Sequence, residues 1–277
     1  MTSMNRREFV GVAAAGLASA ATAFAAKNIP IAVQVYSVRG IAQKDTAGVL
    51  ARIAKIGYQG VEFAGYYGHS AQDIRKMLDD NGLKAAGSHI GLEALLGDQL
   101  LKTIEFNRTI GNHNLIVPGM SQKYRSSIAA WKDTAKLFSE IAAKLKPEGM
   151  NVGYHNHTLE FQKMEDQTPF DAFFGSTSPD VKVQLDIGHA AQAGADVVDI
   201  IRRYNGRIIS VHVKEYAPGR EGAVLGEPGG AIPWKEVFKA LAASPGLEWY
   251  ISEEEGKACK ETECIETSFG RLRKMTQ

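Results

Sequence analysis

After residue 28 the chain alternates between short apolar runs and longer amphipathic segments. The apolar runs are rich in β-branched and aromatic residues, which is typical of buried β-strands. The intervening segments place apolar residues three or four positions apart, which is typical of helices that cover a sheet. The predicted strands are residues 29–37, 58–64, 83–89, 113–119, 150–157, 181–189, 207–215 and 247–254. The predicted helices include residues 45–56, 70–81, 124–146, 190–204, 233–243 and 262–274.

This alternation predicts a parallel sheet. Eight strand and helix units in about 250 residues have the size of a closed barrel. An open, doubly wound sheet is the alternative, but no glycine-rich phosphate loop follows the first strand, where the sequence reads VYSVRG (35–40). No linker or low-complexity segment interrupts the later chain. We therefore predict one α/β domain over residues 29–277, a single (β/α)8 TIM barrel.

The first 26 residues have a different character. In MNRREFVGVAAAGLASAATAFAA (4–26), Arg6 and Arg7 precede Phe9 and a weakly apolar run that ends in small residues. This resembles a twin-arginine export signal over residues 1–26, with cleavage after Ala25 or Ala26. The run is shorter and less apolar than a membrane-spanning helix of about 20 residues. We expect the export machinery as a partner, a periplasmic or secreted mature protein, and no stable membrane insertion.

The composition is that of a soluble globular protein. The chain has 277 residues, of which 44% are hydrophobic and 23% charged, and its formal net charge is +1. This length and composition can bury a large core. The near-neutral charge gives no basic surplus for neutralising phosphates, so nucleic acid is not an expected partner. The sequence leaves the oligomeric state open between a monomer and a homo-oligomer.

Polar side chains able to bind a metal end several of the predicted strands. The active sites of such barrels lie at the carboxyl ends of the strands, so these side chains should share one rim. They are Glu62, His89, His155, His157, Glu160 just beyond strand five, Asp186, His189, His212, Lys214 and Glu253. Because alternate strand residues face opposite sides, Gln184 should point inward with Asp186, and Ser210 with His212 and Lys214.

A mixed set of imidazoles and carboxylates suits one divalent ion. Mn²⁺, Zn²⁺, Co²⁺ or Fe²⁺ is favoured over Mg²⁺ and Ca²⁺, which prefer oxygen ligands alone. No cysteine lies at these strand ends, which argues against a closed structural zinc site. The pattern therefore predicts an open, catalytic metal site.

Four motifs in the C-terminal half carry a family resemblance. GYHNHTLEF (153–161), VQLDIGH (183–189), GRIISVHVKE (206–215) and WYISEEE (249–255) resemble the xylose isomerase-like barrel superfamily, in particular its sugar isomerases, epimerases and inosose dehydratase-like proteins. The resemblance covers the chain after residue 28. It implies that Asp186, His212 and Glu253 are metal ligands and that His189 lies beside the substrate. Glu62 and His89, on the same rim, are also predicted to bind substrate.

The end of strand five departs from that family pattern. Many epimerases of the superfamily supply a glutamate there, whereas this chain has histidines at 155 and 157, and Glu160 is the nearest carboxylate. Either Glu160 reaches back to the metal, which we favour, or His155 or His157 replaces the glutamate. The predicted ligand set is Glu160, Asp186, His212 and Glu253.

The chemistry expected of such a site begins with removal of a carbon-bound proton. A divalent ion chelated by the oxygens of a keto-sugar stabilises an enediolate, and a base of near-neutral pKa must take the proton. The candidate catalytic residues are His155, His157, Glu160, Lys214 and Glu253, although Lys214 could instead pair with Glu215 or Glu253. We predict a metal-dependent isomerase or epimerase of a non-phosphorylated keto-sugar. The alternatives are a lyase or dehydratase of a 3-keto-glycoside or inosose, and a sugar-binding barrel without catalysis.

Overall fold

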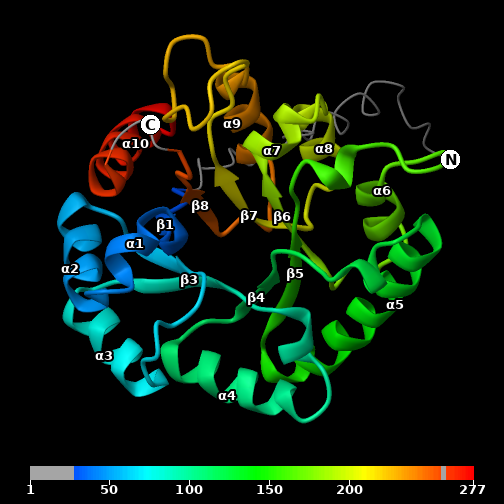
Figure 1. Cartoon of the computed structure of the whole chain (residues 1–277), viewed down its shortest axis with the longest axis horizontal. Helices are drawn as coiled ribbons and strands as arrows, with labels where there is room; N and C mark the ends of the chain where they lie inside the picture. The colour runs from blue at the N-terminus through cyan, green and yellow to red at the C-terminus, as the bar shows by residue number, and fades with distance from the viewer. Residues whose placement is uncertain (1–27, 257–259) are drawn as a thin grey trace, which may run out of the picture.

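The computed structural model describes residues 28–256 and 260–277, and the predicted export signal, residues 1–26, lies outside this part. Within it, parallel strands form one closed barrel, in which β1 (Ile31–Gln34) pairs with β8 (Trp249–Ser252). Helices surround the barrel (Figure 1). The predicted (β/α)8 TIM barrel is therefore confirmed.

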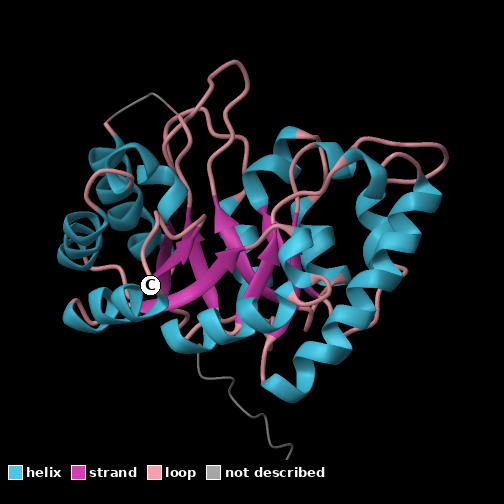
Figure 2. Ribbon diagram, turned by 60° about the horizontal axis from the view of Figure 1, so that its bottom comes forward, coloured by secondary structure: helices cyan, strands magenta, loops and turns pink. Residues whose placement is uncertain are grey.

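The elements follow the predicted alternation, although the strands are shorter than the apolar runs. The other strands are β2 (Gly60–Phe63), β3 (Lys84–His89), β4 (Asn114–Val117), β5 (Asn151–His155), β6 (Lys182–Asp186) and β7 (Ile208–Val213). The α-helices are α1 (Arg39–Ala42), α2 (Thr46–Ile56), α3 (Ala71–Asp80), α4 (Gln99–Ile110), α5 (Ile128–Leu145), α6 (Pro169–Phe174), α7 (Ile187–Gln192), α8 (Val197–Arg203), α9 (Trp234–Ala242) and α10 (Glu261–Met275). The 3-10 turns are η1 (Val35–Val38), η2 (Leu92–Leu95), η3 (Gln122–Tyr124), η4 (Lys146–Glu148) and η5 (Leu159–Phe161). Figure 2 shows the strands at the centre, enclosed by helices and loops. Of the helices in the described residues, none has the length and apolar character needed to cross a membrane.

Helix α3 shows how local sequence sets the helix ends. The Ser70 side chain accepts a hydrogen bond from Asp73 N, and the Asp73 carboxylate accepts one from Ser70 N, which forms a capping box. At the other end Gly82 has a φ of 63°, a left-handed conformation that glycine adopts without strain. The helix predicted over 70–81 is accordingly observed over 71–80.

The strand predicted over 181–189 is wrong beyond Asp186. Asp186 is the N-cap of α7, where its Oδ1 accepts a hydrogen bond from His189 N at 2.7 Å. His189 therefore belongs to a helix, and the helix predicted over 190–204 is divided between α7 and α8. This turn places the Asp186 carboxylate at the carboxyl rim of the barrel.

The inside of the barrel is apolar near its amino-terminal end and polar at its carboxyl rim. Ala32, Ala86, Trp249 and Ile251 form a small apolar cluster of their own, separate from the large core between strands and helices. On β1 Ala32 comes two residues before Gln34, so both face the same side. A small apolar layer thus fills the amino-terminal part of the barrel, and the candidate functional residues lie at the carboxyl end.

Candidate metal centre and active site

Side chains from four neighbouring strands converge at the carboxyl end of the barrel. His155 ends β5, Asp186 ends β6, His212 lies on β7 and Glu253 follows β8. One potential ligand atom from each lies within 4.8 Å of the other three. All four are buried, with exposed fractions between 0% and 5%. This mixed nitrogen and oxygen set is one that borderline divalent ions accept.

The Asp186 carboxylate tests whether a cation fits this group. Its Oδ2 is buried and has no hydrogen-bond partner among the described residues. It lies 3.9 Å from His155 Nε2, which is too long for a hydrogen bond. Two ligand atoms that each bond one ion at about 2.1 Å lie up to about 4.2 Å apart, so the separation suits shared coordination. Since an unpaired buried oxygen is costly, the residues present fit a divalent ion.

The structure does not bring Glu160, a predicted ligand and base, to this group. Glu160 lies in η5, where its Oε1 accepts a hydrogen bond from the Tyr154 hydroxyl at 2.7 Å and its Oε2 accepts one from His157 N at 2.8 Å. Tyr154 packs against Trp131 and other aromatic rings of the outer core. The 3-10 turn therefore directs the carboxylate outward. His155, which the sequence left as the alternative, takes a place among the donors.

This placement predicts that Glu160→Gln leaves the metal content unchanged. The amide cannot accept both hydrogen bonds as the carboxylate does, so we expect a loss of about 1–3 kcal/mol in the free energy of unfolding. Elemental analysis and urea unfolding measure the two effects, and Glu140→Gln, an exposed change on α5, is the control. A loss of metal from the Glu160 variant alone would show that this carboxylate is a ligand.

Glu62, which is predicted to bind substrate, lies against His212 of the donor group and is fully buried. Its Oε2 is 2.6 Å from His212 Nε2 and 3.1 Å from His89 Nε2. On β3, Gly87 leaves room for this side chain, because a Cβ there would lie 2.6 Å from Glu62 Oε1. Glu62 thus bonds His212 Nε2, whereas His212 Nδ1 faces Glu253. Carboxylates commonly bond the second nitrogen of metal-binding histidines in this way.

Glu62, His212 and Glu253 shift one another's pKa values in this arrangement. Burial opposes ionisation of Glu62, but His89 and His212 outweigh it and hold the pKa of Glu62 below its usual range. Burial would lower the pKa of His212, but Glu253 and Glu62 outweigh it and raise that pKa to about 10. Against burial, His212 and then Lys214 hold the pKa of Glu253 below its usual range. Buried carboxylates that stay ionised provide the negative field that a divalent cation needs.

Gln184 determines which nitrogen of His155 carries the proton. Gln184 Nε2 lies 2.7 Å from Glu62 Oε1 and donates to it, because a carboxylate can only accept. Gln184 Oε1 therefore faces His155 Nδ1 at 2.9 Å and His89 Nε2 at 2.8 Å, and both nitrogens must donate. Burial lowers the pKa of His155 well below its usual value, so its ring is neutral. Nε2, on the side of Asp186, keeps its lone pair for a metal. The inward orientation predicted for Gln184 is confirmed by its bond to Glu62 across the barrel.

A cavity of about 380 Å³ opens beside the donor group. Predicted site residues His89, His155, His157 and Glu253 line it, together with Tyr36 and Glu255. The His157 ring lies 5.0 Å from the His155 ring and 4.9 Å from the His189 ring. Lys214 Nζ donates to His189 Nε2 at 3.1 Å and contacts Glu255. The structure thus brings the remaining predicted residues around one rim.

The pKa values of His157 and Lys214 are shifted in opposite directions. Loss of hydration, followed by the nearby His189, lowers the pKa of His157. Burial opposes the charge on Lys214, but Asp186, Glu253 and Glu255 outweigh it and raise the pKa of Lys214. At neutral pH the rim therefore offers an imidazole that can accept a proton and an ammonium group that can donate one.

Sequence reasoning missed Tyr36. The residue is 40% exposed and lines the cavity, and Arg39 Cζ lies 4.1 Å above the centroid of its ring. A rigid aromatic face of this kind can pack against the carbon-bound hydrogens of a sugar. The available signal was an aromatic residue near the carboxyl end of the first predicted strand, where barrel strands carry function.

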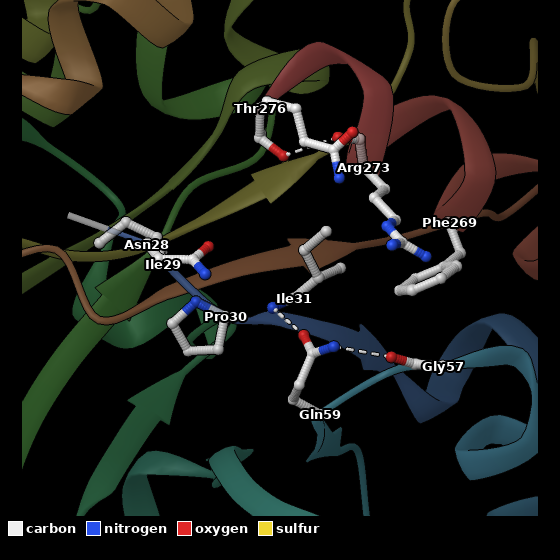
Figure 3. A pocket seen from close by; sticks show the side chains of 10 residues that line it. Asn28, Ile29, Pro30, Ile31, Gly57, Gln59, Phe269, Arg273 and Thr276 are labelled. Atoms are coloured by element: carbon white, nitrogen blue, oxygen red, sulfur yellow. Dashed lines mark hydrogen bonds between the residues drawn. The ribbon is translucent and has the colours of Figure 1, made fainter. Parts of the chain in front are cut away.

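A separate hollow of about 460 Å³ lies at the amino-terminal end of the barrel (Figure 3). Gln59 lies in its wall, where Oε1 accepts a hydrogen bond from Ile31 N and Nε2 donates to Gly57 O. Phe269 and Arg273 of α10 also line it. None of the candidate metal donors lines this hollow, and conserved chemistry in such barrels lies at the opposite end. The candidate active site is therefore the cavity at the carboxyl rim.

Comparisons with known proteins agree with this architecture. The sequence model of the family described as xylose isomerase-like TIM barrel matches residues 50–275. Rhizopine catabolism protein MocC of Rhizobium meliloti is 22% identical over 242 residues, which cover 74% of this chain and 73% of that protein. Inosose dehydratase of Clostridium perfringens is 21% identical over 235 residues, which cover 69% and 76%. A solved structure described as a sugar phosphate isomerase/epimerase, from Parabacteroides distasonis, has a TM-score of 0.77 and 24% identity and covers 90% of this chain and 100% of that chain.

Proposed function

This chain belongs to the xylose isomerase-like TIM barrel family, and from that membership we propose that it is a divalent-metal-dependent lyase of a non-phosphorylated keto-sugar or inosose. The observation that carries the proposal is the pair of unlike groups beside the donor set, the imidazole of His157 and the ammonium of Lys214. An elimination needs one base and one acid, whereas an epimerase needs a group on each face that can both give and take a proton. The curated relatives named inosose dehydratase give further support.

Four side chains form the metal site of the proposed enzyme. His155, Asp186, His212 and Glu253 would hold the ion, with His155 oriented by Gln184. When bound, a divalent ion supplies a Lewis acid that polarises the carbonyl of the substrate and stabilises the negative charge that develops there. His89 and Tyr36 shape the cavity in which the keto ring would lie.

Two rim residues move the protons in this proposal. His157 takes the proton from the carbon beside the carbonyl, and the released electron pair forms a carbon–carbon double bond. The bond from the next carbon to its oxygen substituent breaks, and the oxygen keeps the electron pair. Lys214, held by His189 and Glu255, returns a proton to that oxygen. The products are an unsaturated ketone and water or an alcohol.

Loss of isotope label to solvent tests the first step. Substrates that carry deuterium on the carbon beside the carbonyl should release it to water as product forms, with metal-loaded protein and not with metal-free protein. A panel of ketoses, inososes and keto-glycosides covers the candidate substrates. Retention of the label by every member of the panel would instead favour a sugar-binding barrel without catalysis.

Isomerisation or epimerisation is a second candidate for the same site. Glu253 and His157 both line the cavity, so two proton-carrying groups of different kinds can face a bound sugar. This reaction shares the first proton transfer but returns the proton to carbon, and its product has the same mass as the substrate. The mass of the product therefore separates the two candidates.

We also propose that residues 1–26 direct export by the twin-arginine route, so that the mature protein is periplasmic or secreted. Arg6, Arg7 and Phe9, followed by the weakly apolar run, support this proposal. The double change Arg6→Lys and Arg7→Lys should retain the precursor in the cytoplasm in cell fractionation, whereas the control Arg202→Lys should not. Arrival of the double variant in the periplasm at the wild-type level would refute the proposed route.

A further inference from the structure

A second cavity, of about 570 Å³, adjoins the first on the side of Lys214. Glu253 and Glu255 line both cavities, and Lys214, which contacts Glu255, lines the second. The long loop between β7 and α9 forms much of its wall and is drawn in yellow to orange in Figure 1. A ligand in the first cavity could therefore continue past Lys214 into the second. If the leaving group of the proposed elimination is water, no part of the substrate fills this second cavity.

Hydrogen bonds fix the wall of this second cavity before any ligand binds. Glu215 is 7% exposed, and its Oε2 accepts hydrogen bonds from Gly226 N at 2.8 Å and Trp234 Nε1 at 2.9 Å. Arg271, on α10, donates to Leu225 O at 2.7 Å. The loop is thus anchored to its own base and to a helix. A preformed wall reduces the ordering cost of binding a ligand.

A glycine contact brings the loops after β7 and β8 together over the cavity. A Cβ placed on Gly222 would lie 2.1 Å from Gly256 Cα, so this approach is open only to glycine. Gly222 also has a φ of 69°, which suits glycine. Both residues line the cavity. The two loops therefore form a continuous wall around a defined space.

The lining of the second cavity includes two exposed polar side chains and one buried nitrogen that have no partner among the described residues. The side chains of Gln192 and Glu221 make no hydrogen bond or ion pair with any residue the structure describes. His189 Nδ1 is buried without a partner in the same part of the chain. Lys214 Nζ donates to His189 Nε2, so Nδ1 is the ring nitrogen that has no partner. Unpaired donors and acceptors suit a ligand rich in hydroxyl groups.

We infer that the second cavity is the subsite for the leaving group, and that the substrate is a keto-glycoside whose leaving group is a second sugar. This inference rests on the proposed elimination. The keto ring occupies the first cavity, and the glycosidic oxygen lies beside Lys214 where the cavities meet.

The proposed step balances without an oxidant, a reductant or water. For a ring oxidised at carbon 3, His157 takes the proton from carbon 2, and that electron pair forms the double bond to carbon 1. The bond from carbon 1 to the glycosidic oxygen breaks, the oxygen keeps the pair, and Lys214 gives it a proton. The products are an unsaturated keto-sugar and the free second sugar.

The test compares kcat/KM for elimination from a 3-keto-disaccharide and from the corresponding methyl 3-keto-glucoside. Binding energy from the remote sugar should raise kcat/KM for the disaccharide by about 10-fold or more. Gln192→Trp, an exposed change that fills the second cavity, should lower this ratio toward one. Gln72→Trp, an exposed change on α3, is the matched control and should keep the wild-type ratio. An equal ratio in wild type and Gln192→Trp would overturn the subsite.

A second measurement separates failure of the subsite from failure of the lyase proposal. If wild-type protein eliminates from neither substrate and releases no isotope label, the lyase proposal fails. Calorimetric titration with free glucose, the leaving sugar, then tests the subsite alone. Binding that is weakened in Gln192→Trp and unchanged in Gln72→Trp supports the subsite, and binding equal in all three proteins, or absent from wild type, overturns it.

Discussion

Asp186→Asn should remove both the bound metal and the turnover while the barrel stays folded. The Asp186 Oδ2 atom is buried, has no hydrogen-bond partner among the described residues and lies 3.9 Å from His155 Nε2, so it is placed to share a cation with that nitrogen. An amide keeps an oxygen able to cap α7 but loses that charge. Loss of a Lewis acid worth several kcal/mol should lower kcat by about 10²–10³-fold or more.

Elemental analysis of the purified protein measures the bound metal, and kcat measured after incubation of the protein with metal measures the turnover. His212→Ala should behave in the same way, since His212 is a member of the same donor group. Asp166→Asn, an exposed change in the loop before α6, is the control and should keep metal and turnover. Wild-type metal content in both Asp186→Asn and His212→Ala would contradict the proposed centre.

His157→Asn should retain the metal and lose turnover by about 10²–10⁴-fold, the usual contribution of a positioned general base. His157 lines the cavity but is outside the group of four donors. A base acts only when unprotonated, and the pKa of His157 is lowered from 6.5. Wild-type kcat/KM should therefore fall as the pH drops through that lowered pKa, below 6.5, and His157→Asn should lack this acidic limb.

His113→Asn is the matched control for this prediction. His113 lies just before β4, at the amino-terminal end of the barrel, where it bonds Glu248. We expect wild-type turnover and an unchanged acidic limb in the control. If His157→Asn kept wild-type turnover with an unchanged acidic limb, the base would be another residue of the rim.

The fold could be predicted because its signal is repeated along the chain. Each strand buries both faces and each helix has one apolar side, so their alternation identifies a parallel barrel without long-range information. The predicted element boundaries are wrong where tertiary contacts end a strand or helix. Apolar Ile187 continues the pattern of β6, but the hydrogen bond from His189 N to Asp186 turns the chain into α7 at that position.

The candidate site could be predicted only in part. Strand alternation places Asp186 and His212 inward, and the structure has them side by side in the register of β6 and β7. The direction of Glu160 depends on Tyr154, whose side chain lies in the outer core, and no sequence spacing reports that bond. Gln184 orients His155 through a contact with Glu62 across the barrel, 122 residues away in sequence, which a pattern along one strand cannot reveal.

The mass of the product tests the proposed reaction most directly. Metal-loaded protein is incubated with an inosose and with a 3-keto-glycoside, and each product is identified by mass spectrometry and ultraviolet absorbance. We expect the inosose product to be lighter by one water, and the keto-glycoside to yield an unsaturated ketone and a free alcohol or sugar. Products of unchanged mass, without new absorbance, would contradict the lyase and assign the site to isomerisation or epimerisation.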